Sequence, residues 1–151
     1  MAVSVSDNFG AALESLSEKF GNELDRAMKI SALQIRDKVA AGISSQKWNW
    51  ENLNEKYSLF KKNHHGSSKI LISGIRLGKN LVPTNYRNSF SYQQIKPGVW
   101  TVGTNHIQGR SMEFGDEERK IPARPHLEPT LLEYKETYME NVMNALKRSL
   151  K

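Results

Sequence analysis

Residues 7–45 have the sequence DNFGAALESLSEKFGNELDRAMKISALQIRDKVAAGISS, which contains no proline. Apolar side chains recur in it three, four or seven positions apart, a spacing that places them on one face of an α-helix. They are Phe9, Leu13, Leu16, Phe20, Leu24, Met28, Ile35 and Val39. The stretch therefore predicts one amphipathic helix from Asp7 to about Ser45, around which the rest of the fold is arranged.

The length of this helix has a consequence for assembly. It measures roughly 55 Å, which is more than the core of a small domain covers. We therefore expect part of its apolar face to contact another subunit. Asp7 or Ser6 is expected to cap its start, and Gly42 or the pair Ser44-Ser45 to end it. Because a glycine inside a helix costs about 1 kcal/mol relative to alanine, a break near Gly21 into two helices is an alternative.

The middle of the chain predicts a short helix and a β-hairpin. Trp48, Trp50 and Leu53 form an aromatic hinge, after which Asn54 can cap a helix that extends to Lys62, followed by a polar loop over residues 63–68. The apolar residues 70–72 are too few to assign. Polar and apolar residues alternate from Phe90 to Gln94, and β-branched and aromatic residues return at 99–102. The intervening Lys96-Pro97-Gly98 suits a tight turn, because proline presets φ and glycine accepts a positive φ.

Prolines organise the C-terminal third. Pro122, Pro125 and Pro129 are expected to keep residues 121–128 extended. A second amphipathic helix is predicted from Pro129 to the C-terminus. The fold class is therefore α+β, with a long N-terminal helix, a small antiparallel β-sheet and a C-terminal helix. We expect one domain over residues 1–151, made of a helical region (1–46), a loop and hairpin core (47–128) and the last helix (129–151).

The composition of the chain excludes several classes of protein. The chain has 151 residues, a net charge of +6 and no cysteine, which removes disulfides, thiolate metal sites and cysteine nucleophiles. Its N-terminus has no signal-peptide pattern, and no apolar run reaches the roughly 20 residues of a membrane span. We therefore expect a protein that is made in the cytoplasm and does not contact a membrane.

The positive charge is concentrated in one segment. Between Lys56 and Arg110 there are nine basic residues and no acidic one: Lys56, Lys61, Lys62, Lys69, Arg76, Lys79, Arg87, Lys96 and Arg110. A segment with charge of one sign suits an acidic partner, which can be nucleic acid, an acidic protein surface or the lumen of a ring. The simpler interpretation is a solvated face.

Residue patterns typical of catalysis are missing from the sequence. It has no Gly-x-Ser-x-Gly, no phosphate-binding Gly-x-x-x-x-Gly-Lys and no His-Glu-x-x-His. The pair His64-His65 lacks further ligands at a fixed spacing. The carboxylates of residues 113–118 alternate with basic residues and are expected to form salt bridges in an exposed loop. His106 and His126 are expected to be surface or hydrogen-bonded histidines. We predict a protein that is not an enzyme and has no cofactor or metal.

Two segments of the sequence resemble segments of a known protein family. The first is Met112-Glu113-Phe114-Gly115, and the second, after a charged insert, is Ile121-Pro122-Ala123-Arg124-Pro125-His126-Leu127 with a helix behind it. Upstream of them, in order, stand Trp50, Leu53, Tyr57 and Lys61, then Ile70–Gly74, Arg87–Phe90 and Val102–Asn105. Together they resemble the tail-completion and virion-morphogenesis family of tailed bacteriophages, over about two-thirds of the chain.

The resemblance implies a structural virion protein that is assembled in the host cytoplasm. Members of such a family form a ring, here expected to be a hexamer, at the head–tail junction. The implied partners are further copies of the chain, head connector or adaptor proteins, tail tube or terminator proteins, and genomic DNA in the lumen. Whether the role is tail completion, tail termination or head adaptation stays open. The alternative function is a nucleic-acid-binding module that uses the basic segment 56–110.

The motif residues also have a physical interpretation of their own. Glu113-Phe114-Gly115 offers an aromatic anchor followed by a residue free to turn the chain. Pro122-Ala123-Arg124-Pro125 is a stiff segment that loses little entropy when it is ordered. Arg124 is predicted to pair with a carboxylate, either across to the next subunit or locally, where the pair would orient the C-terminal helix.

Overall fold

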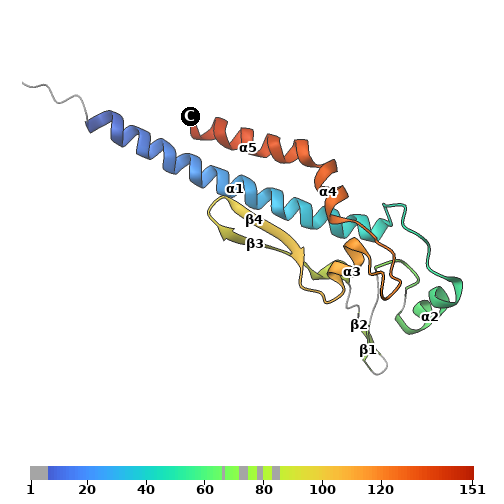
Figure 1. The fold of residues 1–151 in the computed structure, drawn as a ribbon. Coiled ribbons are helices and arrows are strands. Elements are labelled where there is room, and N and C mark those ends of the chain that lie inside the picture. The colour runs from blue at the N-terminus through green and yellow to red at the C-terminus, as the bar shows by residue number, and fades with distance from the viewer. Residues whose placement is uncertain (1–6, 66, 72–74, 78–79, 83–85) are drawn as a thin grey trace, which may run out of the picture.

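A computed structural model gives the chain the predicted α+β fold. The structure describes residues 7–65, 67–71, 75–77, 80–82 and 86–151. Helix α1 (Asp7–Ser45) is continuous, so the alternative break near Gly21 does not occur. It lies between α5 (Lys135–Ser149) on one side and the hairpin of β3 (Phe90–Lys96) and β4 (Val99–Thr104) on the other (Figure 1).

The end of α1 is fixed by a residue with a positive φ. Gln46 has φ +55°, its N–H donates to the Ile43 carbonyl at 3.3 Å, and the N–H of Lys47 donates to the Gly42 carbonyl at 3.0 Å. These two bonds are those of a Schellman cap. The Gln46 amide then exchanges hydrogen bonds with the backbone of Ile70, at 2.9 and 3.0 Å. These bonds hold the unusual backbone conformation in place and tie the end of α1 to the following loop.

Gly42 is inside the helix and does not end it. A Cβ at this position would lie 2.3 Å from the Trp48 ring. Glycine therefore allows the aromatic hinge to fold back against the last turns of α1. The helix ends at Ser45 because the chain has to reverse there to bring Trp48 and Trp50 onto the helix.

Helix α2 (Glu55–His65) begins where it was predicted. The side chain of Asn54 accepts a hydrogen bond from the Lys56 N–H at 3.0 Å, which confirms its capping role. The helix continues three residues past Lys62, so the expected polar loop is shorter than residues 63–68.

Two separate antiparallel hairpins form the β structure. Strands β1 (Ile75–Leu77) and β2 (Asn80–Val82) were not predicted, whereas the β3–β4 hairpin was. In the latter, Tyr92 pairs with Val102 and Gln94 with Trp100, and the register shifts between Gln94 and Lys96. A 3-10 turn, η1 (Tyr86–Ser89), leads into β3. Of the short apolar segment 70–72, Ile72 lies outside the described residues, as do residues 73 and 74 after it.

Asp25 joins the turn of this hairpin to α1. One oxygen of its carboxylate accepts hydrogen bonds from the Gly98 N–H at 2.9 Å, the Trp100 indole at 3.0 Å and the Gln94 amide at 2.6 Å. The bonds from Gly98 and Trp100 lower the pKa of Asp25. Gly98 has φ +73°, as predicted for the turn.

The C-terminal third differs from its prediction in two places. Residues 109–114 form a helix, α3 (Gly109–Phe114), where a loop was expected. The predicted last helix is divided at Tyr134 into α4 (Leu127–Glu133) and α5, and α4 begins two residues before Pro129. The extended proline segment therefore ends at His126.

The hydrophobic core lies around the C-terminal half of α1. Its buried members come from α1, the hinge, the loop after α2, η1 and β3: Val39, Ile43, Trp50, Ile70, Leu71, Tyr86 and Phe90. Trp48, Leu53, Met112 and Leu127 pack on its edge. This position places the motif segments of residues 112–127 directly against the core.

Candidate functional site

The structure brings the two motif segments together through Glu113. This residue is on α3 and is buried, with 8% of its surface exposed, which corrects the expectation of a salt bridge in an exposed loop. Its carboxylate accepts hydrogen bonds from the backbone N–H groups of His126 at 3.1 Å, Leu127 at 3.2 Å and Glu128 at 3.2 Å. A carboxylate at these groups caps α4, since the first N–H groups of a helix have no partner within it.

His126 continues the network into the core. Its Nδ1 lies 3.0 Å from the Glu113 carboxylate and 2.7 Å from the Arg124 carbonyl. Its Nε2 lies 2.9 Å from the Tyr86 hydroxyl. A proton on Nδ1 serves both of those acceptors and leaves Nε2 to accept from Tyr86, a tautomer inferred from the network. The ring has no exposed surface, so His126 is the hydrogen-bonded histidine of the two predicted alternatives.

The electrostatics follow from burial and from these bonds. Burial acts to raise the pKa of Glu113, but the hydrogen bond from His126 and the backbone bonds from Glu128 and Leu127 lower it overall. The pKa of Tyr86 is raised, first by burial and then by the charge of Glu113. The carboxylate is thus ionised and the phenol neutral near pH 7.

The Tyr86–His126–Glu113 series has residue types found in catalytic sites, but its central histidine has no exposed surface. All three side chains are buried, and each polar end is bonded within the subunit. The rings of Trp50 and Phe90 pack around His126, at 6.3 and 5.5 Å from its ring, whereas Tyr86 and Glu113 also line an open pocket of about 550 Å³. The series is therefore a joint between α3, α4 and η1.

Gly115 and the loop behind it close the motif. Gly115 has φ +81°, and a Cβ there would lie 3.0 Å from the Ala123 nitrogen, so glycine turns the chain as predicted. Asp116 and Ile121 then form a bridge with hydrogen bonds of 2.9 and 2.8 Å. Asp116 also pairs with Arg119 at 3.7 Å, one of the salt bridges expected in this insert.

The aromatic motif residues have opposite environments. Trp50 is buried, and its indole donates to the Pro125 carbonyl at 3.1 Å. Phe114 is 75% exposed and does not anchor the subunit internally. Of the two aromatic motif residues, Phe114 is therefore the one whose side chain is available to another molecule.

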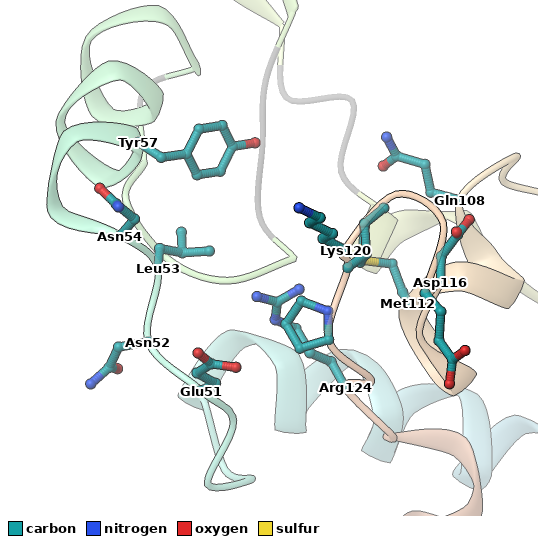
Figure 2. A pocket seen from close by; sticks show the side chains of 13 residues that line it. Glu51, Asn52, Leu53, Asn54, Tyr57, Gln108, Met112, Asp116, Lys120 and Arg124 are labelled. Carbon is teal, nitrogen blue, oxygen red and sulfur yellow. The ribbon is translucent and has the colours of Figure 1, made fainter.

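Arg124 differs from its prediction. No ion pair joins it to any carboxylate in the described part of the chain, so the local salt bridge is wrong. It is 8% exposed, and its Nε has no hydrogen-bond partner. Figure 2 shows the guanidinium pointing into a cleft between the segment before α2 and the loop of residues 116–122.

The basic segment does not form a single surface. Lys61 is buried, whereas Lys69 and Arg87 both contact Ser44 at the end of α1. Lys96 is at the turn of the β3–β4 hairpin, far from α2 with Lys56 and Lys62 (Figure 1). Arg110 is exposed on α3. Lys79 and the side chain of Arg76 lie outside the described residues.

Other candidate sites have little support in the geometry. His64 stacks on Phe60 and lies 2.9 Å from its carbonyl. Within the described residues no three or more His, Asp or Glu side chains gather as they would around a metal ion. Within the same residues, no helix combines the length and apolarity needed to cross a bilayer.

Comparisons of this chain with protein-family models, curated proteins and solved structures find no match. The site is therefore defined by its geometry. Sequence reasoning missed Tyr86, which sits in a polar stretch, and the burial of Lys61. The burial of Lys61 had no local signal, because Tyr57, one helical turn before it, is itself 52% exposed.

Proposed function

We propose that this protein is a structural component of a tailed-bacteriophage particle. It assembles into a closed ring at the head–tail junction and completes the tail or joins it to the head. The observation that carries this proposal is the α1 stripe, formed by Phe9, Leu13 and Leu16, which are 76%, 56% and 36% exposed. The first turns of α1 extend beyond α5 and beyond the hairpin (Figure 1). An exposed apolar stripe on an unsupported helix favours a protein partner.

A second stripe lies on α5. Asn141 bonds to Ser31 and Gln34 of α1, and Ala145 and Ser149, one and two turns further along, are buried. Tyr138 and Val142 are half-buried, whereas the exposed apolar side chains of α5 and of its C-cap residue Leu150 are spaced at three and four residues. This α5 stripe consists of Met139, Met143, Leu146 and Leu150, which are 59%, 52%, 37% and 65% exposed.

Two different apolar stripes on one subunit suit a ring. If the α1 stripe of one copy packs on the α5 stripe of the next, every copy uses both surfaces, and a heterologous contact of this kind closes when the rotation per subunit fits. Six copies is the number that the motif resemblance implies. The neighbours it implies are head connector or adaptor proteins on one side and tail tube or terminator proteins on the other.

The ring is tested by measuring the mass of the purified protein in solution. The wild type is expected to form one closed species, and Leu13→Asp and Met143→Asp are each expected to be monomeric. Ser15→Asp and Asn144→Asp are the matched controls, because they add the same charge to the same helices outside the stripes and should leave the ring intact.

A mixture of the two stripe variants tests the pairing itself. Leu13→Asp retains an intact α5 stripe and Met143→Asp an intact α1 stripe, so one interface can form between them. The mixture should give heterodimers and no ring. A wild type that stays monomeric up to about 100 μM, where an interface of micromolar Kd is occupied, contradicts the proposal.

The place in the particle needs a separate test. Phage lacking this reading frame should yield separate tails and DNA-filled heads by electron microscopy, and the wild-type gene should restore joined particles. Normal particles in its absence would exclude the head–tail role. Duplex DNA affinity below micromolar Kd at physiological salt, with a steep salt dependence, would favour the nucleic-acid alternative.

A further inference from the structure

Two cations are buried in one cavity, and neither forms an ion pair within the part of the chain that the structure describes. Lys61 is 6% exposed and Arg124 is 8% exposed. The Lys61 ammonium donates to the backbone carbonyl of Lys69, and the Arg124 Nε has no acceptor. Neither side chain forms an ion pair with a carboxylate of the described residues. Because folded proteins pair their buried charges, this arrangement lacks an anion.

The two cations line a cavity of about 210 Å³, here called the cation pocket. Its other walls are mainly apolar and aromatic, with Leu53, Tyr57, Leu71 and Met112 among them. Leu53, Tyr57, Met112 and Arg124 also line the open cleft of about 690 Å³, so the pocket has an entrance. In Figure 2, Arg124 and Tyr57 both point into this space.

The electrostatics of the pocket favour an anion. Removal from water, and after it the neighbouring charge of Arg124, lower the pKa of Lys61 to about 8. Burial also lowers the pKa of Arg124, while the carboxylate of Glu51, which is too far away for an ion pair, acts against this change. A negative charge placed between the two cations would offset both burial costs.

We infer that the cation pocket binds a carboxylate presented by a partner protein, as an aspartate or glutamate side chain that enters through the cleft. The planar guanidinium of Arg124 can hold both carboxylate oxygens, and Lys61 adds a second donor. The apolar walls suit the methylene stem of such a side chain. This inference does not depend on the ring, because any protein with a protruding acidic side chain could supply the group.

The rim of the cleft argues against nucleic acid. Three acidic residues, Glu51, Asp116 and Glu117, and one basic residue, Lys120, line it. The net negative charge of this rim repels a polyanionic backbone that has to pass along it. A single carboxylate on a narrow stem meets less repulsion, and it can reach cations that are more than nine-tenths buried. A phosphate in a duplex cannot protrude in this way.

Sodium propionate serves as a probe for an acidic side chain. The measurement is the side-chain Nε–Hε resonance of Arg124, followed by NMR in wild-type protein near pH 7, with sodium chloride at matched ionic strength as the reference. We expect a saturable shift with propionate and none with chloride. Glu51→Gln should tighten binding about threefold to tenfold, because it removes a like charge near the site. Arg124→Gln and Lys61→Met should each weaken it at least tenfold.

The wild-type resonance keeps the test decisive even if a pocket variant fails to fold. No saturable shift, or the same shift with chloride, overturns the inference. Tighter binding of inorganic phosphate or of a duplex oligonucleotide than of propionate would assign the pocket to phosphate and overturn it also. Loss of stability in Glu51→Gln without any anion response would show that Glu51 is itself the counterion. Measuring the mass of the protein in the same samples tests ring formation separately, so failure of the pocket and failure of the ring can be distinguished.

Discussion

Raising the pH from 7 to 10 is expected to stabilise this protein, because Lys61 is buried as a cation. Folding lowers its pKa from 10.5 to about 8. Between these values the unfolded chain binds more protons than the folded protein, so the free energy of unfolding rises with pH. The difference of about 2.5 pH units corresponds to about 3 kcal/mol at 1.36 kcal/mol per unit, of which about 2 to 3 kcal/mol is gained between pH 7 and pH 10.

The titration of other groups ends this rise in stability near pH 10. Burial raises the pKa of Tyr138 from 10.0 to about 12, and that of Tyr86 is raised as well. Above pH 10 the unfolded tyrosines ionise while the folded ones stay protonated, so stability falls again. Lys47, whose pKa is raised by its hydrogen bond with Glu133, also loses its contribution only above 10.5. Stability is therefore expected to pass through a maximum near pH 10.

The assay is urea unfolding followed by tryptophan fluorescence at a series of pH values. Lys61→Met keeps the length and apolar stem of the side chain but removes the charge, so it should abolish the rise. Lys62→Met, on the exposed face of α2, should leave it unchanged. A wild-type stability that is flat or falls between pH 8 and 10, or a Lys61→Met protein with the wild-type slope, would refute the reasoning.

Three further substitutions test the motif and the long helix by the same urea assay. Glu113→Gln should cost about 2 to 3 kcal/mol, since it weakens the hydrogen bonds that several buried donors make to a charged acceptor, and the exposed Glu117→Gln should cost almost nothing. Because folding lowers the pKa of Glu113, its contribution is complete above 4.5 and is lost as the pH falls below that; a stability profile of Glu113→Gln as steep as the wild type in this range would contradict its role. Gly115→Ala should destabilise by about 1 to 3 kcal/mol, because alanine disfavours φ +81° and its Cβ would crowd residue 123. Gly21→Ala should instead stabilise by about 1 kcal/mol, as its Cβ would meet no atom within 4 Å; equal signs for the two glycines would count against the structure.

The elements that sequence predicted correctly are those with a local physical cause. Helix α1 follows from its apolar period, the start of α2 from Asn54, and the β3–β4 turn from Pro97-Gly98. Strands β1 and β2 have only three residues each, too few for a period to appear. The bend at Tyr134 interrupts a continuous apolar pattern, so periodicity alone could not locate it.

The candidate site was harder to predict because its charged residues are buried. Sequence reasoning placed Glu113 in an exposed loop and Arg124 in a salt bridge, since charged side chains usually remain in water or pair. Glu113 is buried because the backbone of residues 126–128 needs an acceptor. That need comes from tertiary placement of α3 against α4, which no local pattern encodes.

The buried charged residues are of two kinds. One has all its partners within the subunit and stabilises the fold, and the other forms no ion pair there and is expected to bind a partner. Glu113 has all its partners within the subunit, so its removal should destabilise the fold and affect assembly only indirectly. Arg124 and Lys61 have no counterion within the described subunit, and their burial costs stability that the isolated chain does not recover. A subunit would recover that cost only when another molecule supplies the anion. Removing either cation should therefore leave the fold intact and weaken docking, which is the behaviour expected of a binding residue and the opposite of that expected for Glu113.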